Sequence, residues 1–289
     1  MRCLLFATAL AACGGTPDAS QPDASRPDAS QPDAGTTDGA ASTSGSRCMA
    51  TSAQVTCSSH MLQLAGRTVT YELPIGDAPA AGWPLAVFYQ GSFVPGSRAF
   101  AASTSDPFGQ YELTSTVKAL LDRGYAVVAP NAQNDGTLYW QSNVPPYATS
   151  WSGCDDDVFV RHLLAATTDA TFGPVDATRR YAMGISSGGF MTSRMAVSYA
   201  GTFRALAVAS GSYATCGVTC TVPELPTDHP PTLFLHGGAD TTVPLSAMTP
   251  YRDKLGAGGF VVEAVIDQGL GHEWLPEGKT AIPDWFDAH

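Results

Sequence analysis

Short apolar runs alternate with helical patterns along residues 84–266, and this alternation limits the folds open to the chain more than any other feature. PLAVFYQG (84–91) and YAVVAP (125–130) are continuous apolar runs, as is typical of strands buried on both faces of a parallel sheet. Between them, ELTSTVKALLDRG (112–124) carries apolar residues at helical spacing and ends in glycine. This order predicts a doubly wound, mostly parallel sheet with helices on both faces.

The pattern continues on both sides of these segments. RTVTYELP (67–74) alternates and is predicted to be an edge strand. Helices are expected at 155–170 and 188–200, and strands at 179–185 and near residues 204, 231 and 260. Reactive groups in doubly wound sheets lie at the carboxyl ends of strands. Polar residues just after the predicted strands are therefore the first candidates for a site.

The N-terminus has the pattern of an export signal. MRCLLFATALAAC contains one arginine and an apolar run too short to span a bilayer. LAAC (10–13) resembles the bacterial lipobox, which implies cleavage before Cys13 and attachment of a lipid to its sulfur. An ordinary signal peptide cut after Ala11 or Ala12 is the alternative.

A five-residue repeat follows the signal. Residues 17–34 read PDASQPDASRPDASQPDA and contain no large apolar side chain, so this part cannot form a core. We therefore expect a signal peptide at 1–12, a disordered tether at 13–47 and one folded domain at 48–289. The tether either holds the domain away from a membrane or is a neutral spacer.

The charge of the chain argues against a polyanionic partner. Lys and Arg number 15 and Asp and Glu 26, which gives a formal net charge of −11. No basic patch can then neutralise phosphates, so we expect no nucleic-acid partner. We expect membrane contact only through the lipid anchor of an exported, monomeric protein of the bacterial cell envelope, at the outer membrane or the cell surface.

The cysteines predict local disulfides, because an exported chain meets an oxidising compartment. The predicted pairs are Cys48 with Cys57 and Cys216 with Cys220, which leaves Cys154 unpaired. The alternative, a zinc site at CGVTC, lacks a second pair of ligands, so no metal is expected.

The stretch YAMGISSGGF (181–190) contains the pattern G-x-S-x-G, with Ser186 at its centre. Between an apolar strand and an apolar helix, this motif forms a tight turn in which Gly184 and Gly188 avoid clashes and the central hydroxyl stands over the sheet edge. Ser186 is therefore the candidate nucleophile, and Ser187 offers its backbone N–H to a developing oxyanion. A small-residue turn without chemistry is the alternative.

A serine hydroxyl needs a base to become a good nucleophile. PTLFLHG runs into GADTTVP and places Asp240 just after a strand, and FVVEAVI runs into DQGLGHEW and places His272 after the next. The chain order Ser186, Asp240, His272 is the order of nucleophile, acid and base that accompanies this turn. A turn-forming aspartate and an uninvolved loop histidine are the alternatives.

Together these segments resemble the α/β-hydrolase superfamily, in the branch of poly(3-hydroxybutyrate) depolymerases, feruloyl esterases and acetylxylan esterases. The similarity covers about residues 66–286 and includes the D-D-V-F helix, the serine turn, H-G-G-A-D-T-T-V-P and G-H-E-W. The resemblance implies a catalytic domain at 48–289 that cleaves carboxylic esters through an acyl-enzyme, without a cofactor. It also implies Ser186 as nucleophile, Asp240 as acid and His272 as base.

One segment departs from the family pattern. Family members usually carry His-Gly and a small residue after the first buried strand, where this chain has Gln90-Gly91-Ser92. The backbone N–H groups of Ser92 and Ser187 are the oxyanion donors that we expect, and Ser187→Ala should then leave most activity intact. We expect His236 to be a structural residue, packed beside the loop that carries Asp240.

The substrate must be selected by loops. Residues 134–153 form a long aromatic-rich loop, and Trp140 and Trp151 within it, together with Trp274, are the candidate substrate contacts. For the rings within the loop, the alternative is that they pack the loop onto the domain. Polyhydroxyalkanoate, feruloyl and acetyl-polysaccharide esters are all open as substrates, and the substrate could be polymeric.

Two other functions compete with ester hydrolysis. A serine peptidase of the prolyl oligopeptidase type shares the serine turn and the H-G-x-x-D pattern, but it normally needs an accessory domain, for which 48–289 leaves no room. A non-catalytic surface lipoprotein that binds glycan is the second alternative, if the loop at Gln90 no longer supports catalysis.

Overall fold

The computed structural model describes residues 45–133, 138–217 and 220–289. The expected signal peptide, Cys13 and the tether up to residue 44 lie outside the described residues, as do residues 134–137 of the aromatic loop. None of the helices in the described ranges is both long and apolar enough to cross a membrane.

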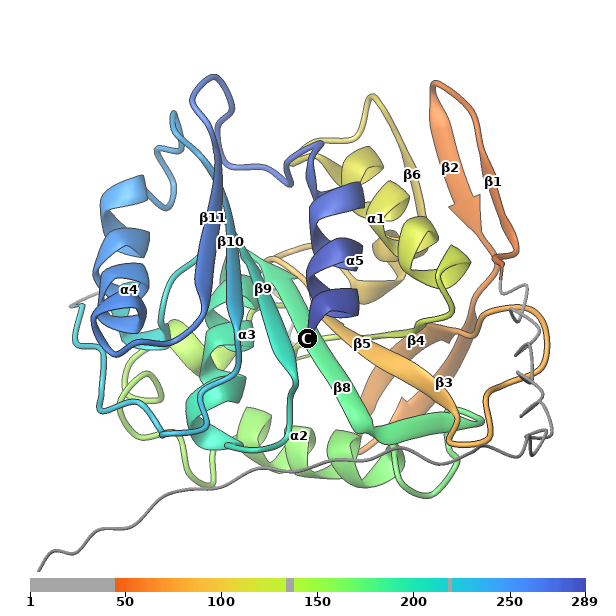
Figure 1. Ribbon diagram of the computed structural model, residues 1–289, viewed down its shortest axis with the longest axis horizontal. Helices are drawn as coiled ribbons and strands as arrows, with labels where there is room; N and C mark the ends of the chain where they lie inside the picture. The colour runs from red at the N-terminus through yellow and green to blue at the C-terminus, as the bar shows by residue number, and fades with distance from the viewer. Residues whose placement is uncertain (1–44, 134–137, 218–219) are drawn as a thin grey trace, which may run out of the picture. The chain divides into compact units, whose positions relative to one another are not determined.

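The central sheet has eight strands in the order β11-β10-β9-β8-β5-β7-β4-β3 (Figure 1). The strands from β11 to β7 run parallel, whereas β4 is antiparallel to β7 and β3 is antiparallel to β4. This confirms the predicted doubly wound, mostly parallel sheet. The strands are β3 (His60–Leu64), β4 (Arg67–Glu72), β5 (Trp83–Tyr89), β7 (Ala126–Pro130), β8 (Val175–Ile185), β9 (Ala205–Ala209), β10 (Thr232–Gly237) and β11 (Val262–Asp267).

The prediction of an edge strand at 67–74 was wrong, because β3 pairs along the outer side of β4. Two residues, Ala65 and Gly66, join the two strands, and both have positive φ angles of 46° and 80°. A two-residue hairpin turn of the favoured type needs positive φ at both positions. The hairpin therefore places β3 at the sheet edge.

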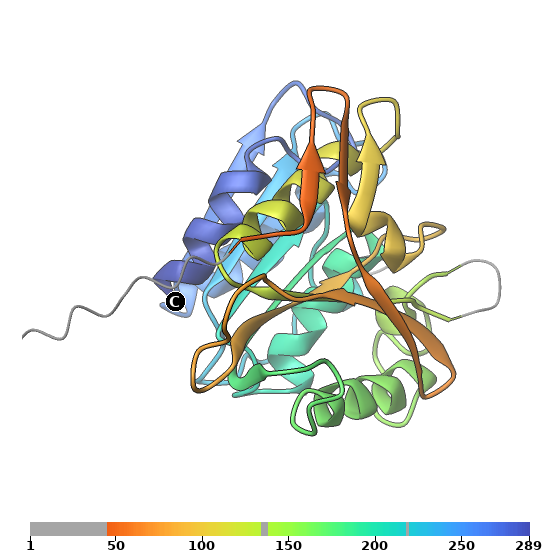
Figure 2. The ribbon, with the colours of Figure 1, turned by 90° about the vertical axis from the view of Figure 1, so that its right-hand side faces the viewer.

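Helices cover both faces of the sheet (Figures 1 and 2). One apolar cluster joins α1 (Gln110–Asp122) and α5 (Gly278–Ala288) to residues such as Phe88 and Met183 of the sheet. Alternate residues of the same strands, Val87 and Ala182, face the cluster that contains α2 (Asp155–Ala166) and α3 (Ser187–Ser198). This alternation is what strands buried on both faces require.

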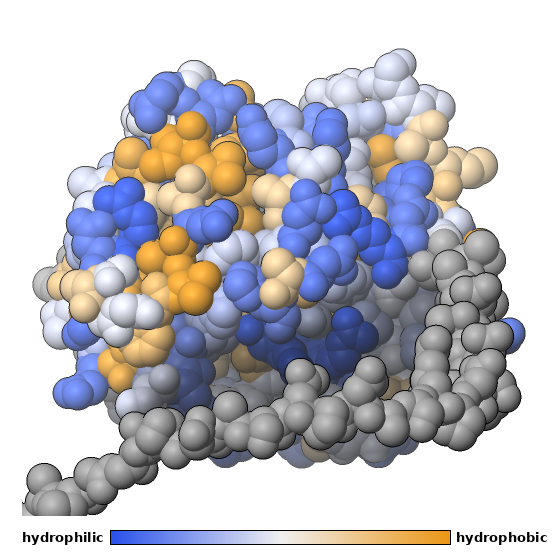
Figure 3. All heavy atoms as spheres, viewed as in Figure 1, coloured by the Kyte–Doolittle hydropathy of each residue, from blue (hydrophilic) through white to orange (hydrophobic). Residues whose placement is uncertain are grey.

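Helix α4 (Leu245–Ala257) packs against β10 and β11 at that edge of the sheet, in a third cluster that includes Phe190 of α3 and Phe234 of β10. Figure 3 shows apolar patches on the surface over α4 and β11, and mostly hydrophilic residues over α5. Residues of β11 are half-buried or exposed, as expected for a strand with one neighbour.

A small second sheet lies outside the main one and was not predicted. It consists of β1 (Cys48–Ala50), β2 (Gln54–Cys57) and β6 (Ala101–Ser103), in the order β1-β2-β6. The disulfide Cys48–Cys57 joins β1 to β2, and Cys216 pairs with Cys220. Cys154 is a buried free cysteine, so all three cysteine predictions within the described residues are confirmed.

Candidate active site

Ser186 lies at the turn between β8 and α3. Its backbone angles are φ 56° and ψ −124°, which are sterically costly for a residue with a side chain. The N–H of Ser186 donates to the carbonyl of Ala209 in the neighbouring strand β9 at 3.0 Å, which anchors the turn to the sheet. This is the strained strand-to-helix turn that the G-x-S-x-G pattern predicts.

Two glycines make this turn possible. A Cβ on Gly188 would lie 1.9 Å from the carbonyl oxygen of Tyr89, and one on Gly184 would lie 2.3 Å from the carbonyl oxygen of Gly188. Both distances are far below van der Waals contact. The start of α3 can therefore approach the end of β5 only because Gly188 lacks a side chain, and it can lie this close to the end of β8 only because Gly184 does.

Asp240 follows β10 and is almost fully buried, with 4% exposure. Its Oδ1 atom accepts hydrogen bonds from the backbone N–H groups of Thr242 and Val243, each at 2.8 Å. Its Oδ2 atom lies 2.8 Å from Nδ1 of His272. The loop thus holds the carboxylate in one orientation, aimed at the histidine.

His272 lies in the segment between β11 and α5. Because a carboxylate only accepts hydrogen bonds, Nδ1 of His272 carries the proton that faces Asp240, and the neutral ring keeps Nε2 as an acceptor. Within the part of the chain that the structure describes, no hydrogen bond joins Ser186 to His272, but both residues line one pocket of about 320 Å³. The structure therefore brings the three predicted residues to one place.

The pocket opens at the carboxyl ends of β5 and β8. Besides Ser186 and His272, its walls are formed by Gly91, Ser92, Phe93, Val94, Phe108, Gln110, Ile185 and Thr242. None of these lining residues is an aspartate, glutamate, lysine or arginine. The pocket thus offers an apolar surface with a few hydroxyl and amide groups beside the serine and the histidine.

The predicted oxyanion residues lie on two sides of the turn. Ser92 is on the wall of the pocket. Ser187 is the first residue of α3, where backbone N–H groups have no partner within the helix. Its hydroxyl accepts a hydrogen bond from the backbone N–H of Trp140 at 3.0 Å. The side chain of Ser187 therefore binds the loop that carries Trp140, and its backbone N–H is the group that could donate to an oxyanion.

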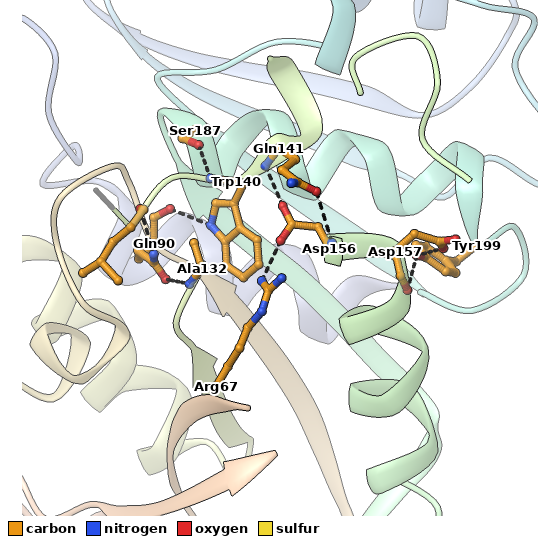
Figure 4. Close-up of polar contacts among 10 residues, drawn as sticks. Arg67, Gln90, Ala132, Trp140, Gln141, Asp156, Asp157, Ser187 and Tyr199 are labelled. Atoms are coloured by element: carbon orange, nitrogen blue, oxygen red, sulfur yellow. Dashed lines mark hydrogen bonds and ion pairs between the residues drawn. The ribbon is translucent and has the colours of Figure 1, made fainter. Parts of the chain in front are cut away.

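The side chain of Gln90, which stands where the resemblance leads us to expect histidine, turns into the protein (Figure 4). It is 1% exposed, its Oε1 accepts from the N–H of Ala132 at 3.2 Å, and its Nε2 donates to the carbonyl of Leu138 at 3.2 Å. Gln90 is thus a structural link between the end of β5 and the segment after β7.

The expectation that Trp140, Trp151 and Trp274 contact substrate is corrected by their burial. Their exposures are 0%, 7% and 1%. Each indole N–H has a partner inside the protein: the carbonyl of Gln90 at 3.0 Å for Trp140, the hydroxyl of Tyr199 at 3.3 Å for Trp151, and Thr116 Oγ1 at 3.0 Å for Trp274. The rings pack loops onto the domain, which is the alternative that the sequence left open.

Two phenylalanines that the sequence analysis missed stand at the pocket instead. Phe93 is 72% exposed and Phe108 is 52% exposed, and both line the pocket. Both have positive φ angles, 68° and 61°. The sequence did contain one signal for Phe93. It lies only three residues after Gln90, close to the carboxyl end of a predicted strand, and site residues in such sheets gather at the carboxyl ends of strands.

His236 was predicted to be structural, and its surroundings confirm this. It is fully buried, and its Nε2 donates to the carbonyl of Val243 at 2.8 Å. Burial lowers the pKa of His236, which keeps the ring neutral. In the described ranges, no cluster of three or more His, Cys, Asp or Glu side chains could hold a metal ion.

Solved structures share this fold. An acetyl xylan esterase from Aspergillus awamori matches with a TM-score of 0.59 and 18% identity, over 80% of this chain and all of that chain. A carboxylesterase from Bacillus cereus matches with a TM-score of 0.56 and 11% identity, over 77% of this chain and 94% of that chain. No protein-family model matches. The fold is that of the α/β-hydrolases.

A poly(3-hydroxyoctanoate) depolymerase from Pseudomonas fluorescens is 48% identical over 225 residues, which are 77% of this chain and 80% of that protein. The chain belongs to the family of this depolymerase. It is a carboxylic-ester hydrolase of the α/β-hydrolase type, which confirms the resemblance seen in the sequence.

Proposed function

We propose that this chain is an exported serine hydrolase that cleaves the ester bonds of a poly(3-hydroxyalkanoate), with Ser186 as nucleophile, His272 as base and Asp240 as acid. The observation that carries the proposal is the pocket. It contains the hydroxyl of a strained turn and an imidazole whose Nδ1 lies 2.8 Å from a buried carboxylate.

The reaction follows from these positions. Asp240 keeps the proton of His272 on Nδ1, so that Nε2 can take the proton of the Ser186 hydroxyl as its oxygen attacks the ester carbonyl. The protonated imidazole is stabilised by the carboxylate and then gives its proton to the leaving alkoxide. Water, deprotonated by the same imidazole, attacks the acyl-enzyme and releases the acid.

The oxyanion of the tetrahedral intermediate needs hydrogen-bond donors. The N–H of Ser187 at the positive end of α3 and the N–H of Ser92 on the pocket wall are the donors in this proposal. Both are backbone groups, so the change from histidine to glutamine at position 90 removes neither.

The lining of the pocket supports a polyester substrate. An aliphatic 3-hydroxyacyl chain has no charged group and presents mostly CH₂ groups, which fit a wall of Phe93, Val94, Phe108 and Ile185. A polysaccharide ester would need polar partners for its ring hydroxyls. A peptide with a charged terminus would need a side chain of opposite charge in the pocket, and the lining contains no Asp, Glu, Lys or Arg. The relative named for poly(3-hydroxyoctanoate) acts on a polymer of this chemical class.

The export part of the proposal rests on the N-terminus and the disulfides. A signal peptide at 1–12, a lipid on Cys13 and a tether at 13–47 would place the domain at the cell surface, where a water-insoluble polymer can be reached. The disulfides Cys48–Cys57 and Cys216–Cys220 support an oxidising compartment. Replacing Cys13 by serine should prevent metabolic labelling with a radioactive fatty acid.

The test compares wild type with Ser186→Ala on films of poly(3-hydroxyoctanoate) and poly(3-hydroxybutyrate), on methyl ferulate and on acetylated xylan. Wild type should release 3-hydroxyacids from a polyester film, and the variant should not. A fluorophosphonate probe should label wild type on Ser186, which fragmentation of the labelled peptide distinguishes from the adjacent Ser187. Turnover of ferulate or xylan without any polyester turnover would overturn the substrate, and labelling of Ser187 instead would overturn the nucleophile.

A further inference from the structure

Trp140 uses its two N–H groups to join two separate parts of the active site (Figure 4). Its backbone N–H donates to Oγ of Ser187, the first residue of α3, at 3.0 Å. Its indole Nε1–H donates to the carbonyl of Gln90, at the end of β5, at 3.0 Å. One fully buried residue therefore bridges the strand end and the helix start.

These two segments supply the donors of the proposed oxyanion hole. Ser92 comes two residues after Gln90, and Ser187 itself provides the second N–H. The distance between the two donors depends on how the loop after β5 lies relative to the start of α3. Trp140 is hydrogen-bonded to one residue in each of these two segments, so it links them.

The loop that carries Trp140 is held from the side of β5. The side chain of Gln90 accepts from the N–H of Ala132 and donates to the carbonyl of Leu138, and both residues precede Trp140 in the chain. The ring of Trp140 also packs edge-on against Tyr89, with 5.2 Å between the ring centroids. Gln90 thus bonds Trp140 through its carbonyl and bonds the backbone two residues before Trp140 through its side chain.

A buried ion pair holds the loop from behind. The N–H of Gln141 donates to Oδ2 of Asp156 at 2.5 Å, and Oδ1 of Asp156 lies 2.6 Å from Nη1 of Arg67. The guanidinium of Arg67 lies 5.9 Å from the ring centroid of Trp140 and 4.5 Å from that of Phe159. The ion pair fixes the backbone next to Trp140, so the bridge has little freedom to shift.

We propose that Trp140 is a positioning residue that sets the oxyanion donors of Ser92 and Ser187 at their working separation. This inference rests on the proposed function and deepens it, because it assigns the geometry of the oxyanion hole to a residue outside the pocket. The carbonyl of Gln90 accepts the indole N–H of Trp140. The side chain of Gln90 bonds the loop that carries Trp140 and does not face the substrate.

The test uses Trp140→Phe, which keeps an aromatic ring and the backbone N–H but removes the indole donor to Gln90. Ser187→Ala removes the acceptor of the other arm and keeps its own N–H. Each change should lower kcat on a soluble p-nitrophenyl ester about tenfold and leave KM near the wild-type value, because a misplaced donor weakens only transition-state binding. For Ser187→Ala this replaces the expectation from the sequence that most activity remains, because the sequence did not reveal that the hydroxyl of Ser187 bonds Trp140. Inhibition by a boronic acid, whose serine adduct mimics the tetrahedral intermediate, should weaken by a similar factor.

The matched control is Trp151→Phe. It removes a buried indole donor of the same loop, here to the hydroxyl of Tyr199, but it touches neither Gln90 nor Ser187. All variants are assayed below the onset of thermal unfolding. The control should keep both kcat and boronate affinity. Equal losses in Trp140→Phe and Trp151→Phe, or unchanged boronate affinity in Trp140→Phe, would overturn the inference.

The outcomes separate this inference from the proposed function. If wild type neither hydrolyses esters nor reacts with the fluorophosphonate, the proposed function fails. If wild type is active, Ser186→Ala is inactive and Trp140→Phe behaves as wild type, only the bridge fails. The double variant Trp140→Phe/Ser187→Ala should lose less than the product of the two single effects, since both changes break one bridge.

Discussion

Nε2 of His236 lies 3.5 Å from Oδ2 of Asp240, so the oxygen that contacts His272 has a second imidazole beside it. Burial lowers the pKa of His236, and its Nε2 proton already binds the carbonyl of Val243. His236 therefore adds a neutral dipole next to the carboxylate and leaves the negative charge of Asp240 available to His272.

Asp240→Asn should lower kcat by about 10³–10⁴, with little change in fold. The side-chain oxygen of asparagine can still accept from Thr242 and Val243, but its amide would then face Nδ1 of His272 and favour the wrong tautomer. Steady-state kinetics on a soluble p-nitrophenyl ester measure the loss. A variant within tenfold of wild type would show that Asp240 does not orient the base.

Phe93→Ala and Phe108→Ala should each reduce the release of acid from a polyester film about tenfold while changing a short soluble ester less than twofold. A phenylalanine that becomes covered by substrate gains about 1.5–3 kcal/mol from burial, and only a long chain can cover these exposed rings. Met61→Ala is the matched control, because Met61 is 70% exposed on β3 and does not line the pocket. Equal losses on film in all three variants would point to general surface adsorption instead.

Gly188→Ala should lower the free energy of unfolding by more than about 3 kcal/mol, because overpacking next to rigid backbone cannot relax easily. The added Cβ would lie 1.9 Å from the carbonyl oxygen of Tyr89. Gly153→Ala should cost about 1 kcal/mol, since its φ is +82° but no heavy atom lies within 4 Å of the added Cβ. Urea unfolding followed by circular dichroism distinguishes the two, and similar costs would contradict the close packing at the turn.

Stability should fall in mild acid through His229. Burial lowers its pKa from 6.5 to about 4, and both ring nitrogens are bonded, to the carbonyl of Pro230 and the hydroxyl of Tyr251. Between these pH values the unfolded chain binds a proton that the folded chain does not, so the free energy of unfolding falls by about 1 kcal/mol per pH unit as pH decreases. His229→Gln, which does not titrate, should show a shallower decline between pH 6 and pH 4 in urea melts, and an unchanged slope would rule His229 out.

The sequence predicted those parts of the fold whose signal is local. Continuous apolar runs gave β5 and β7 almost to the residue, because burial on both faces leaves no other pattern. β1, β2 and β6 have three or four residues each, and β2 pairs with β6 across an interval that contains β3, β4 and β5. Such a pairing is set by tertiary contacts that no short window of sequence contains.

The convergence of the three proposed catalytic residues was predictable for the same reason, since Ser186, Asp240 and His272 each follow a strand. The roles of the aromatic residues were not. An exposed phenylalanine and a buried tryptophan have similar loop surroundings in sequence, and only the positive φ angles of Phe93 and Phe108 and the internal partners of the indoles separate them.

The open rim formed by Phe93 and Phe108 has a practical consequence for engineering. Both rings are largely exposed, whereas Gly184 and Gly188 of the serine turn lie so close to neighbouring backbone that neither has room for a side chain. Combinatorial libraries that randomise these two positions can explore new ester preferences without disturbing the interior. A laboratory search for altered selectivity should therefore begin with this pair and leave the strand ends untouched.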